Sequence, residues 1–478
     1  MRILAIAALA ARIAFLFLWR IDADEPQHLH VAWAWSRGLV QYRDVFDPHF
    51  PLLHLLFAPL LHVVPESSTV FLFARLAILP FAIGCSWLLY RIALPLVGER
   101  GAAISAIAFS VMPPWLPKSV EFRNDTLWIF FWLAALLCFM KGRPFLTGLM
   151  AALCLLASVK ALPLLAAHAL AERRRPAGWP GAVLGAAIPM AAIAIFFAAH
   201  HALAEMIHQT LFFGSAIPVH PARRVGGALA FVAIAPVLAR DKHNHLTQVA
   251  LWYPLLLLCF WPKITPREFL PLLPLAAIAC GGQAILPVRM GRGTRTGRIA
   301  CPPLVFAATL AASIAYARLW RPADDTRQRF LDAAVATTAP GDYVLDMKGD
   351  AVFRRRPVSW IYENVQLLAD RGPEEIVARH CCIAGPDAEL IPPRTRAFLN
   401  RYFLDRGTLR VCGAVAKDGA FTIAVPQTYA VLARDPSRVV IDGVPYRGPR
   451  FLTAGKHTLL APENDVTVLW WRAAKKGV

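Results

Sequence analysis

The chain has 478 residues, of which 57% are hydrophobic, with a mean hydropathy of +0.49 and a formal net charge of +19. This apolar composition excludes a protein that is soluble over its whole length. It also excludes nucleic acid as the partner for the positive charge. The basic residues stand in short clusters between apolar runs, a pattern typical of a multi-span membrane protein.

Apolar runs follow one another up to about residue 320. The first run follows Met1-Arg2 as in a signal peptide, but no small-residue cleavage site comes after it. We therefore expect an uncleaved span in which Arg12 faces protein or lies near an interface. Runs 145–159 and 161–171 are short, and they form either two tilted helices that meet at Lys160 or one long helix. Counting both predicts about 11 transmembrane helices. The runs lie at 3–19, 69–96, 101–117, 125–140, 145–159, 161–171, 180–199, 225–239, 247–261, 269–287 and 300–319.

Charge differs between the two sets of loops. The basic clusters 98–100, 141–143, 173–175, 240–242 and 289–298 each follow an even-numbered run. The positive-inside rule therefore predicts that these loops and the N-terminus are cytoplasmic. The alternate loops then face outward, and they hold acids, histidines and prolines. They are residues 20–68, 113–124, 200–224 and 262–268.

The outward loop 20–68 begins with three acids. Asp24 and Glu25 precede Pro26, and the stretch from Pro26 to Gly38 predicts a short helix that is suited to lying in the membrane interface. Acids at a helix N-terminus can simply be caps, because the helix dipole favours negative charge there. Carboxylates beside hydrocarbon are costly, however, and more often mark a functional site.

A second polar group follows in the same loop, in the stretch "DPHFPLLH". Asp47 and His49 stand around Pro48, which stiffens the turn. A carboxylate and an imidazole can ligate a divalent metal ion, so these two residues are candidate ligands. Two ligands are too few to name the metal.

Cations recur on the outward side, against the positive-inside bias. The stretch "PKSVEFRNDTLW" holds Lys118, Arg123 and Asp125, and "WPKITPREF" holds Lys263 and Arg267. Lys and Arg at the end of a span can be anchors that reach toward the polar interface. A phosphate group would also explain them, since Lys and Arg are its natural ligands. The full candidate set for a phosphate is Lys118, Arg123, Lys160, Lys263, Arg267 and His49.

The last part of the chain, residues 321–478, has the pattern of a soluble domain. Short β-rich runs alternate with Gly and Pro turns, and residues 324–338, 363–371 and 373–380 read as helices. We therefore predict a small α+β domain on the outer face. Cys381, Cys382 and Cys412 allow one disulfide if that compartment is oxidising. No catalytic signature is present, which favours a lid or a scaffold.

Six segments, taken in order, resemble the integral-membrane glycosyltransferases of the GT-C fold, in particular the protein O-mannosyltransferases and the lipid A aminoarabinose transferases. The resemblance covers about residues 20–290. The segments are the acid pair with "SRGLVQYRDVF", "DPHFPLLHLLFAP", "FLFARL" with "LLYRIALPLVGERGA", "EFRNDTLWIFFWLAALL", "GLMAALCLLASVKALPLL" and "REFLPLLPLAAI".

The resemblance implies a fold and an activity. The fold would be a polytopic α-helical domain over residues 1–320, followed by the outer domain over residues 321–478. The donor would be a sugar on a polyprenyl phosphate. The acceptor would be a hydroxyl group of a lipid, a glycan or a protein on the periplasmic face of the bacterial inner membrane, and the anomeric centre would be inverted.

Individual roles follow from the same resemblance. Asp24 would be the catalytic base, Glu25 would orient it or bind the acceptor, and Asp125 would match the acid before the span of the second outward loop. His49 stands where a lysine is common in the family, and a neutral imidazole holds phosphate less strongly.

Two other functions compete with sugar transfer. A lipid or ion transporter would show ionisable groups in the middle of its spans and internal symmetry between its halves. Here the ionisable groups crowd one face, and we find no repeat. A scaffold without catalysis would use the acids only as helix caps. Replacing Asp24 by Asn separates this last function from sugar transfer, because an Asn still caps a helix.

Overall fold

The structure, a computed structural model, describes residues 1–172, 178–212, 225–226, 229, 232–233, 245–261, 264–283, 302–319, 325–359, 361, 370–386, 391–463 and 465–477. Several predictions fall outside these residues. They are Lys263, the basic clusters 173–175, 240–242 and 289–298, and most of the run 225–239 and of the predicted helix 363–371.

The described chain divides into two compact units. The first, the helical unit, comprises Met1–Arg20, Gly38–Leu60 and Leu72–Ala323. The second, the C-terminal unit, comprises Ile21–Arg37, Leu61–Phe71 and Asp324–Val478. The segment with the acid pair, which the sequence places with the helical domain, therefore clusters with the C-terminal part of the chain.

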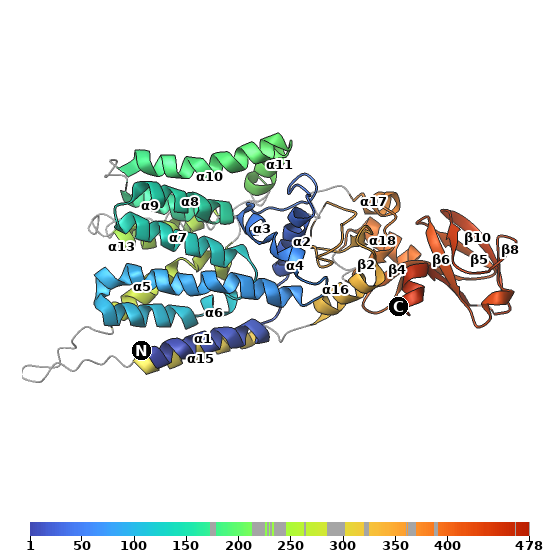
Figure 1. The fold of residues 1–478 in the computed structure, drawn as a ribbon, viewed down its shortest axis with the longest axis horizontal. Helices are drawn as coiled ribbons and strands as arrows, with labels where there is room; N and C mark the ends of the chain where they lie inside the picture. Colours follow the sequence, from blue (N-terminus) through green and yellow to red (C-terminus); the bar gives the residue numbers. More distant parts are fainter. Residues whose placement is uncertain are drawn as a thin grey trace, which may run out of the picture. The chain divides into compact units, whose positions relative to one another are not determined.

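Long apolar helices build the helical unit (Figure 1). They lie where the apolar runs predict them, because such runs satisfy their backbone hydrogen bonds internally. They are α1 (Arg2–Leu18), α5 (Val70–Val111), α7 (Asn124–Met140), α8 (Pro144–Ala157), α9 (Ala161–Glu172), α10 (Trp179–Ala199), α13 (His245–Phe260), α14 (Leu272–Gln283) and α15 (Pro302–Leu319). Shorter elements of this unit are α3 (Leu52–Phe57), α6 (Trp115–Lys118), α11 (Leu203–Ile207), the π-helix η2 (His208–Phe212) and the 3₁₀ helix η4 (Pro266–Phe269). The short helix α4 (Leu60–Val63) has all but its first residue in the C-terminal unit.

Two chain breaks settle how the apolar runs divide. α5 is continuous in hydrogen bonding, but Gly98 has a φ of 72° and separates it into two helices, as the two runs predict. α8 ends at Ala157 and α9 begins at Ala161, so the short pair forms two helices with Lys160 in the break between them. A lysine at a break can reach away from the apolar helix faces.

Glycines bring α8 and α10 into close contact. A Cβ added at Gly148 would lie 1.8 Å from the carbonyl oxygen of Ala182, and one at Gly185 would lie 2.0 Å from that of Phe145. Only glycine permits this backbone approach, which is typical of helix pairs in membranes.

Two buried arginines fix the position of α1. Arg12 donates to the carbonyl oxygen of Ser110 at 2.7 Å and to the hydroxyl of Ser119, so it faces protein as expected. Arg75 donates to the carbonyl oxygens of Trp19 and Arg20 at 2.8 and 2.7 Å. These carbonyls follow the end of α1, where no helical donor remains to pair them.

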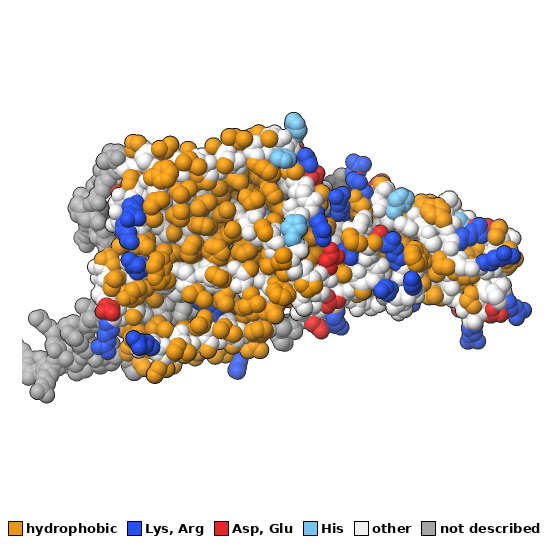
Figure 2. All heavy atoms as spheres, in the orientation of Figure 1, with side chains coloured by type: hydrophobic (Ala, Val, Ile, Leu, Met, Phe, Trp, Pro, Cys, Tyr) orange, Lys and Arg blue, Asp and Glu red, His pale blue; other side chains and the backbone are white. Residues whose placement is uncertain are grey.

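The surface of the helical unit is broadly apolar. Figure 2 shows hydrophobic side chains covering most of its visible face. On α10 alone, Val183, Leu184, Ile188 and Ile195 are all more than half exposed. Among the described helices, α5 and α10 are long and apolar enough to cross a membrane, and the others are shorter. Apolar surface on this scale indicates contact with lipid or with another protein.

The C-terminal unit combines helices with two sheets. Its helices are α2 (Asp24–Ser36), α16 (Thr326–Thr337), α17 (Gly372–Ala378), α18 (Pro393–Tyr402) and α19 (Trp471–Lys476), with a 3₁₀ turn η7 (Pro436–Arg438). In the described residues, seven strands pair in the order β1-β2-β4-β11-β6-β9 with β3 beside β4, and four strands pair in the order β5-β10-β7-β8. The strands are β1 (Val344–Leu345), β2 (Ile383–Ala384), β3 (Phe403–Asp405), β4 (Arg410–Ala416), β5 (Ala420–Ile423), β6 (Gln427–Leu432), β7 (Val440–Ile441), β8 (Val444–Pro445), β9 (Arg450–Leu452), β10 (Gly455–Leu460) and β11 (Val466–Trp470).

Strand pairing and one disulfide organise this unit. β1 and β2 are parallel, and the other pairs are antiparallel. Cys382, beside β2, is bonded to Cys412 in β4, while Cys381 is a buried free thiol. The bond therefore ties together two strands of the sheet that are far apart in sequence.

Helix α2 begins at Asp24, two residues before the expected Pro26. Its apolar side chains Leu29, Val31 and Trp33 are buried in the structure. They pack in protein, whereas the sequence suggested a helix in the membrane interface. The contacts of α2 with the C-terminal part of the chain explain this difference, since a buried helix needs no amphipathic face.

Candidate functional site

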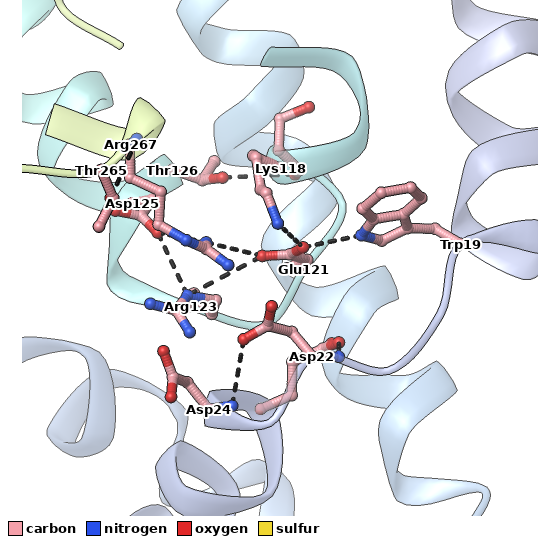
Figure 3. Close-up of polar contacts among 12 residues, drawn as sticks. Trp19, Asp22, Asp24, Lys118, Glu121, Arg123, Asp125, Thr126, Thr265 and Arg267 are labelled. Atoms are coloured by element: carbon pink, nitrogen blue, oxygen red, sulfur yellow. Dashed lines mark hydrogen bonds and ion pairs between the residues drawn. The ribbon is translucent and has the colours of Figure 1, made fainter. Parts of the chain in front are cut away.

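A cluster of charged side chains lies where short elements meet at the ends of the helices (Figure 3). Its central residue is Glu121, in the loop between α6 and α7, which is fully buried. Glu121 Oε1 accepts from Trp19 Nε1 at 2.7 Å and from Lys118 Nζ at 2.8 Å. Glu121 Oε2 accepts from Arg267 Nη1 at 2.8 Å. One carboxylate therefore joins α1, α6 and η4.

Asp125, in the first turn of α7, is the second carboxylate of the cluster. Its Oδ2 accepts from Arg267 Nη1 at 2.8 Å and from Arg123 Nε at 3.2 Å. Its Oδ1 lies 3.7 Å from Lys160 Nζ, which is also 3.0 Å from Glu268 Oε1. Lys160 thus connects Asp125 to a third carboxylate.

A capping box holds Arg267 and Glu268 in place. Thr265 precedes η4, and its hydroxyl accepts from the backbone N–H of Arg267 at 3.3 Å. The Glu268 side chain accepts from the backbone N–H of Thr265 at 2.6 Å. Tyr253 of α13 donates its hydroxyl hydrogen to the Glu268 carbonyl oxygen. These bonds fix the backbone of η4, from which the Arg267 side chain extends.

The described residues of the helical unit bring four cations and three carboxylates together in this cluster. The cations are Lys118, Arg123, Lys160 and Arg267, and the carboxylates are Glu121, Asp125 and Glu268. Charges away from water are stable only when they are paired and hydrogen-bonded. Ammonium and guanidinium groups gathered in one place can bind an anion, and a phosphate oxygen matches both kinds of donor.

The cluster, which we call the cation cluster, is open to solvent at two side chains. Those of Lys160 and Arg267 are 17% and 13% exposed, whereas those of Lys118 and Arg123 are 5% exposed or less. A ligand that approaches the cluster would meet the first two. Lys118 and Arg123 are buried and pair with the carboxylates of Glu121 and Asp125.

His49 belongs to a second polar group of the helical unit. Its Nδ1 lies 2.7 Å from Asp47 Oδ1, and His54 Nδ1 lies 3.3 Å from Asp47 Oδ2. Gln41 Nε2 donates to Asp47 Oδ2 at 3.0 Å. Burial lowers the pKa of His54 to about 4, so its imidazole is neutral near neutral pH. The hydrogen bonds stiffen the turn at Pro48, and metal binding by Asp47 and His49 stays a prediction.

The acid pair occupies a turn of the C-terminal unit. Glu25 is fully buried, and its Oε1 accepts from the backbone N–H of Asp22 at 2.9 Å. The backbone N–H of Asp24 donates to Asp22 Oδ1 at 3.2 Å. The Asp24 side chain is 22% exposed, and its Oδ1 accepts from Lys348 Nζ. Glu25 thus stabilises the turn through a backbone hydrogen bond, whereas the carboxylate of Asp24 is partly exposed to solvent.

The sequence therefore predicted part of this site. Lys118, Arg123, Asp125, Lys160 and Arg267 meet in one cluster. Sequence reasoning missed Glu121, Glu268 and Trp19, although the first two stand among the predicted cations. It also missed Lys348, for which the local sequence gives no signal.

Known proteins match this chain in structure only. No family model matches it, and no curated protein does. Two solved structures of ArnT from Cupriavidus metallidurans match 86% of this chain and 96% of theirs. One is bound to undecaprenyl phosphate, with 12% identity and a TM-score of 0.56. The other is in the apo state, with 14% identity and a TM-score of 0.55.

At this identity the comparison establishes the fold. The resemblance expected from the sequence is confirmed at that level, because the chain has the GT-C fold of the lipid A aminoarabinose transferase ArnT.

Proposed function

We propose that this GT-C-fold chain is a multi-pass glycosyltransferase of the bacterial inner membrane. It transfers a sugar from a polyprenyl-phosphate carrier to a hydroxyl acceptor on the periplasmic face, with inversion of the anomeric carbon. The observation that carries the proposal is the cation cluster, in which Lys160 and Arg267 are partly exposed, in a fold shared with ArnT, which has been solved bound to undecaprenyl phosphate. A phosphate leaving group needs such cations and no acid catalyst.

The cation cluster supplies the leaving-group chemistry. When the bond from the anomeric carbon to the phosphate oxygen breaks, its electron pair stays on the phosphate. In our proposal Lys160 and Arg267 meet this charge, because they are the more exposed cations of the cluster. Asp125 is bonded to Arg123 and Arg267, so we assign it the positioning of these cations and not proton transfer.

Asp24 is our candidate for the base. Its carboxylate lies in the first turn of α2, where the helix dipole favours the ionised form. It takes the acceptor's hydroxyl proton as the new bond to the anomeric carbon forms on the side opposite the phosphate. Such a single displacement inverts the carbon, and a positioned general base contributes roughly 10²–10⁴-fold to the rate.

Three features support the placement at the membrane. The helical unit carries a broad apolar surface, seen in Figure 2, as expected of a unit in contact with lipid. The Cys382–Cys412 disulfide favours an oxidising compartment such as the periplasm for the C-terminal unit. The basic clusters between the apolar runs support a cytoplasmic N-terminus, by the positive-inside rule.

The test compares membranes that contain equal amounts of wild-type protein, Asp24→Asn or Asp418→Asn. Asp418 stands in an exposed turn with φ 50°, a conformation that Asn adopts readily, so this variant is a matched control. The membranes receive radiolabelled polyprenyl-phosphate sugars, and the label is followed from the carrier into other fractions.

We expect transfer with wild type and Asp418→Asn, and a loss of roughly 10²-fold or more with Asp24→Asn. The fraction that receives the label names the acceptor class. Equal transfer by all three proteins would remove Asp24 as the base. Movement of the intact labelled carrier across the bilayer of vesicles, without any transfer, would favour the transporter function and overturn the proposal.

A further inference from the structure

A loop of the C-terminal unit is seated on helix α2. The loop, residues 346–353, follows β1, and it contacts α2 through backbone and side chains alike. Val352 accepts through its carbonyl oxygen from His30 Nδ1 at 3.0 Å. Gly349 has a φ of 91°, and a Cβ at that position would lie 2.8 Å from the Cβ of His30. Only glycine fits between this loop and the helix.

Asp346 holds the loop in one conformation. Its buried carboxylate accepts from the backbone N–H groups of Gly349 at 2.7 Å and Ala351 at 2.8 Å. Arg356 Nε donates to the same carboxylate at 2.7 Å. Three charge-assisted hydrogen bonds on one side chain leave the turn little freedom. Lys348 stands inside this turn, so its backbone position is fixed.

A second set of bonds anchors the end of the loop. The buried Arg354 donates to Glu66 Oε2 at 2.7 Å and to the Thr338 hydroxyl at 2.7 Å. Glu66 also accepts from Arg37, the residue after α2, at 3.1 Å. In the middle of the loop, Asp350 Oδ1 accepts from Arg327 of α16 at 3.0 Å. The loop is thus tied to α16, and through Glu66 to the residue that follows α2.

The turn held by Asp346 places the Lys348 side chain in contact with Asp24, the candidate base. Lys348 Nζ donates to Asp24 Oδ1, and the two side chains are 9% and 22% exposed. Both side chains are therefore largely shielded from water. A charge-assisted bond between shielded groups is stronger than one at an open surface. Asp22 and Glu25, the charged neighbours of Asp24 in its own turn, are both carboxylates. The ammonium group of Lys348 has the opposite charge, so its contact with Asp24 favours the ionised form of that carboxylate.

We propose that Lys348 is a positioning residue of the active site, supplied by the C-terminal unit, which holds the Asp24 carboxylate ionised and oriented for its role as base. This inference rests on the function proposed above. Because Lys348 binds Oδ1, it fixes the rotation of the carboxylate and hence the direction of Oδ2. The C-terminal part of the chain is then more than a lid or scaffold, since the base depends on it.

The proton and electron balance of the step is simple. The acceptor O–H bond breaks, and its proton goes to Asp24. The acceptor oxygen bonds to the anomeric carbon as the bond to phosphate breaks, and the phosphate keeps the electron pair. Lys348 stays an ammonium ion throughout. Its bond to Asp24 weakens once the carboxylate is protonated, which favours return of the proton to water.

The test uses full-length protein in three variants, Lys348→Met, Lys348→Arg and Lys417→Met. Methionine keeps the length of the side chain without its charge, and Lys417 is an exposed control in the same unit.

Transfer is measured as kcat and KM over roughly pH 5–9. We expect Lys348→Met to lower kcat about tenfold or more with little change in KM for the lipid donor. Its acid limb should move to higher pH by about one unit, because a carboxylate that loses a neighbouring cation protonates more readily. Lys348→Arg should keep the wild-type limb.

A second measurement does not need transfer. A carbodiimide modifies protonated carboxyl groups, and mass spectrometry of the Asp24 peptide follows its labelling against pH. The labelling midpoint should rise in Lys348→Met and stay at the wild-type value in Lys417→Met. An unchanged midpoint would overturn the pairing whatever the transfer assay gives.

If the wild type transfers sugar and Lys348→Met matches its rate and pH profile, the inference fails while the proposed function stands. A wild type that transfers nothing counts against the proposed function, and the inference that rests on it falls as well.

Discussion

Arg267 Nη1 donates to two carboxylates at once, to Glu121 Oε2 and to Asp125 Oδ2, at 2.8 Å each. These acids stand on either side of the α7 N-terminus, more than 140 residues before Arg267 in the sequence. One guanidinium nitrogen therefore closes the cation cluster between η4 and the loop before α7.

Replacing Arg267 tests whether the cluster binds the donor phosphate. We expect Arg267→Gln to raise the KM for the polyprenyl-phosphate sugar at least about tenfold, because a charge-assisted bond to phosphate is lost. Arg267→Lys should lie between wild type and Arg267→Gln, since an ammonium keeps the charge but lacks the planar fork. Steady-state kinetics with varied donor measures both effects.

The control for this series is Arg434→Gln, at a side chain that is 96% exposed. It should leave KM at the wild-type value. A donor KM in Arg267→Gln that equals that of the control would show that Arg267 does not bind phosphate.

Glu121 tests the internal balance of the same cluster. Glu121→Gln keeps the size of the side chain but removes one buried negative charge from among Lys118, Arg123 and Arg267. Breaking a buried ion pair by removing one partner costs about 3–5 kcal/mol, because the other charges stay buried without compensation. We therefore expect a clearly lower thermal midpoint in detergent for Glu121→Gln.

Glu374→Gln provides the comparison, since Glu374 forms an exposed ion pair with Arg394. Exposed pairs contribute about 0–1 kcal/mol. Equal midpoints for the two variants would mean that Glu121 is not needed to balance the cluster.

The helices of this fold were predictable because apolar length is a local property. Each described helix of the long apolar runs lies where its run lies, and the break at Gly98 follows a visible change of pattern. Lys160, a charged residue between two apolar runs, indicated part of the site. A lysine between apolar runs is costly in a membrane, and the structure places it beside Asp125 and Glu268.

Other parts of the site were not predictable, because they depend on long-range contacts. Lys348 reaches Asp24 across 324 residues of sequence, and neither stretch carries a mark of the other. The same holds for Trp19 and Glu121, which are 102 residues apart. For α2, the acids Asp24 and Glu25 at its start were visible in the sequence, but its burial involves contact with the loop 346–353, which its own pattern does not indicate.

The disulfide predicts a measurable contribution to stability. Cys382 and Cys412 are separated by 30 residues in sequence, and closing a loop of this size contributes about 3.6 kcal/mol in the chain-entropy account. We expect the double variant Cys382→Ser, Cys412→Ser to unfold at a lower denaturant concentration than wild type. In unreduced protein both positions should also resist thiol reagents, and they should react once the protein is reduced.

Cys381→Ala is the control, because Cys381 is a buried free thiol next to the bond. It should leave the Cys382–Cys412 bond intact in a mass measurement. Free thiols at Cys382 and Cys412 in unreduced wild type would contradict both the bond and the oxidising location.

His30 predicts a pH dependence of stability in the C-terminal unit. Burial lowers the pKa of His30 below the usual value of about 6.5, although Asp346 acts in the opposite direction. Below about pH 6.5, His30 is protonated in the unfolded chain but stays neutral in the folded protein until the pH reaches its lowered pKa. Stability is therefore full above about pH 6.5, and it falls as the pH drops toward the lowered pKa of His30.

His30→Gln isolates this effect from the other titrating groups. Glutamine can still donate to the Val352 carbonyl oxygen but does not titrate, so its stability should fall less between about pH 7 and pH 5 than that of wild type. Denaturant unfolding at both pH values gives the two differences. Equal losses in wild type and His30→Gln would mean that His30 titrates alike in the folded and unfolded chains. The contact between α2 and the loop that carries Lys348 would then be looser than the structure has it, because only a closed contact keeps this imidazole away from water.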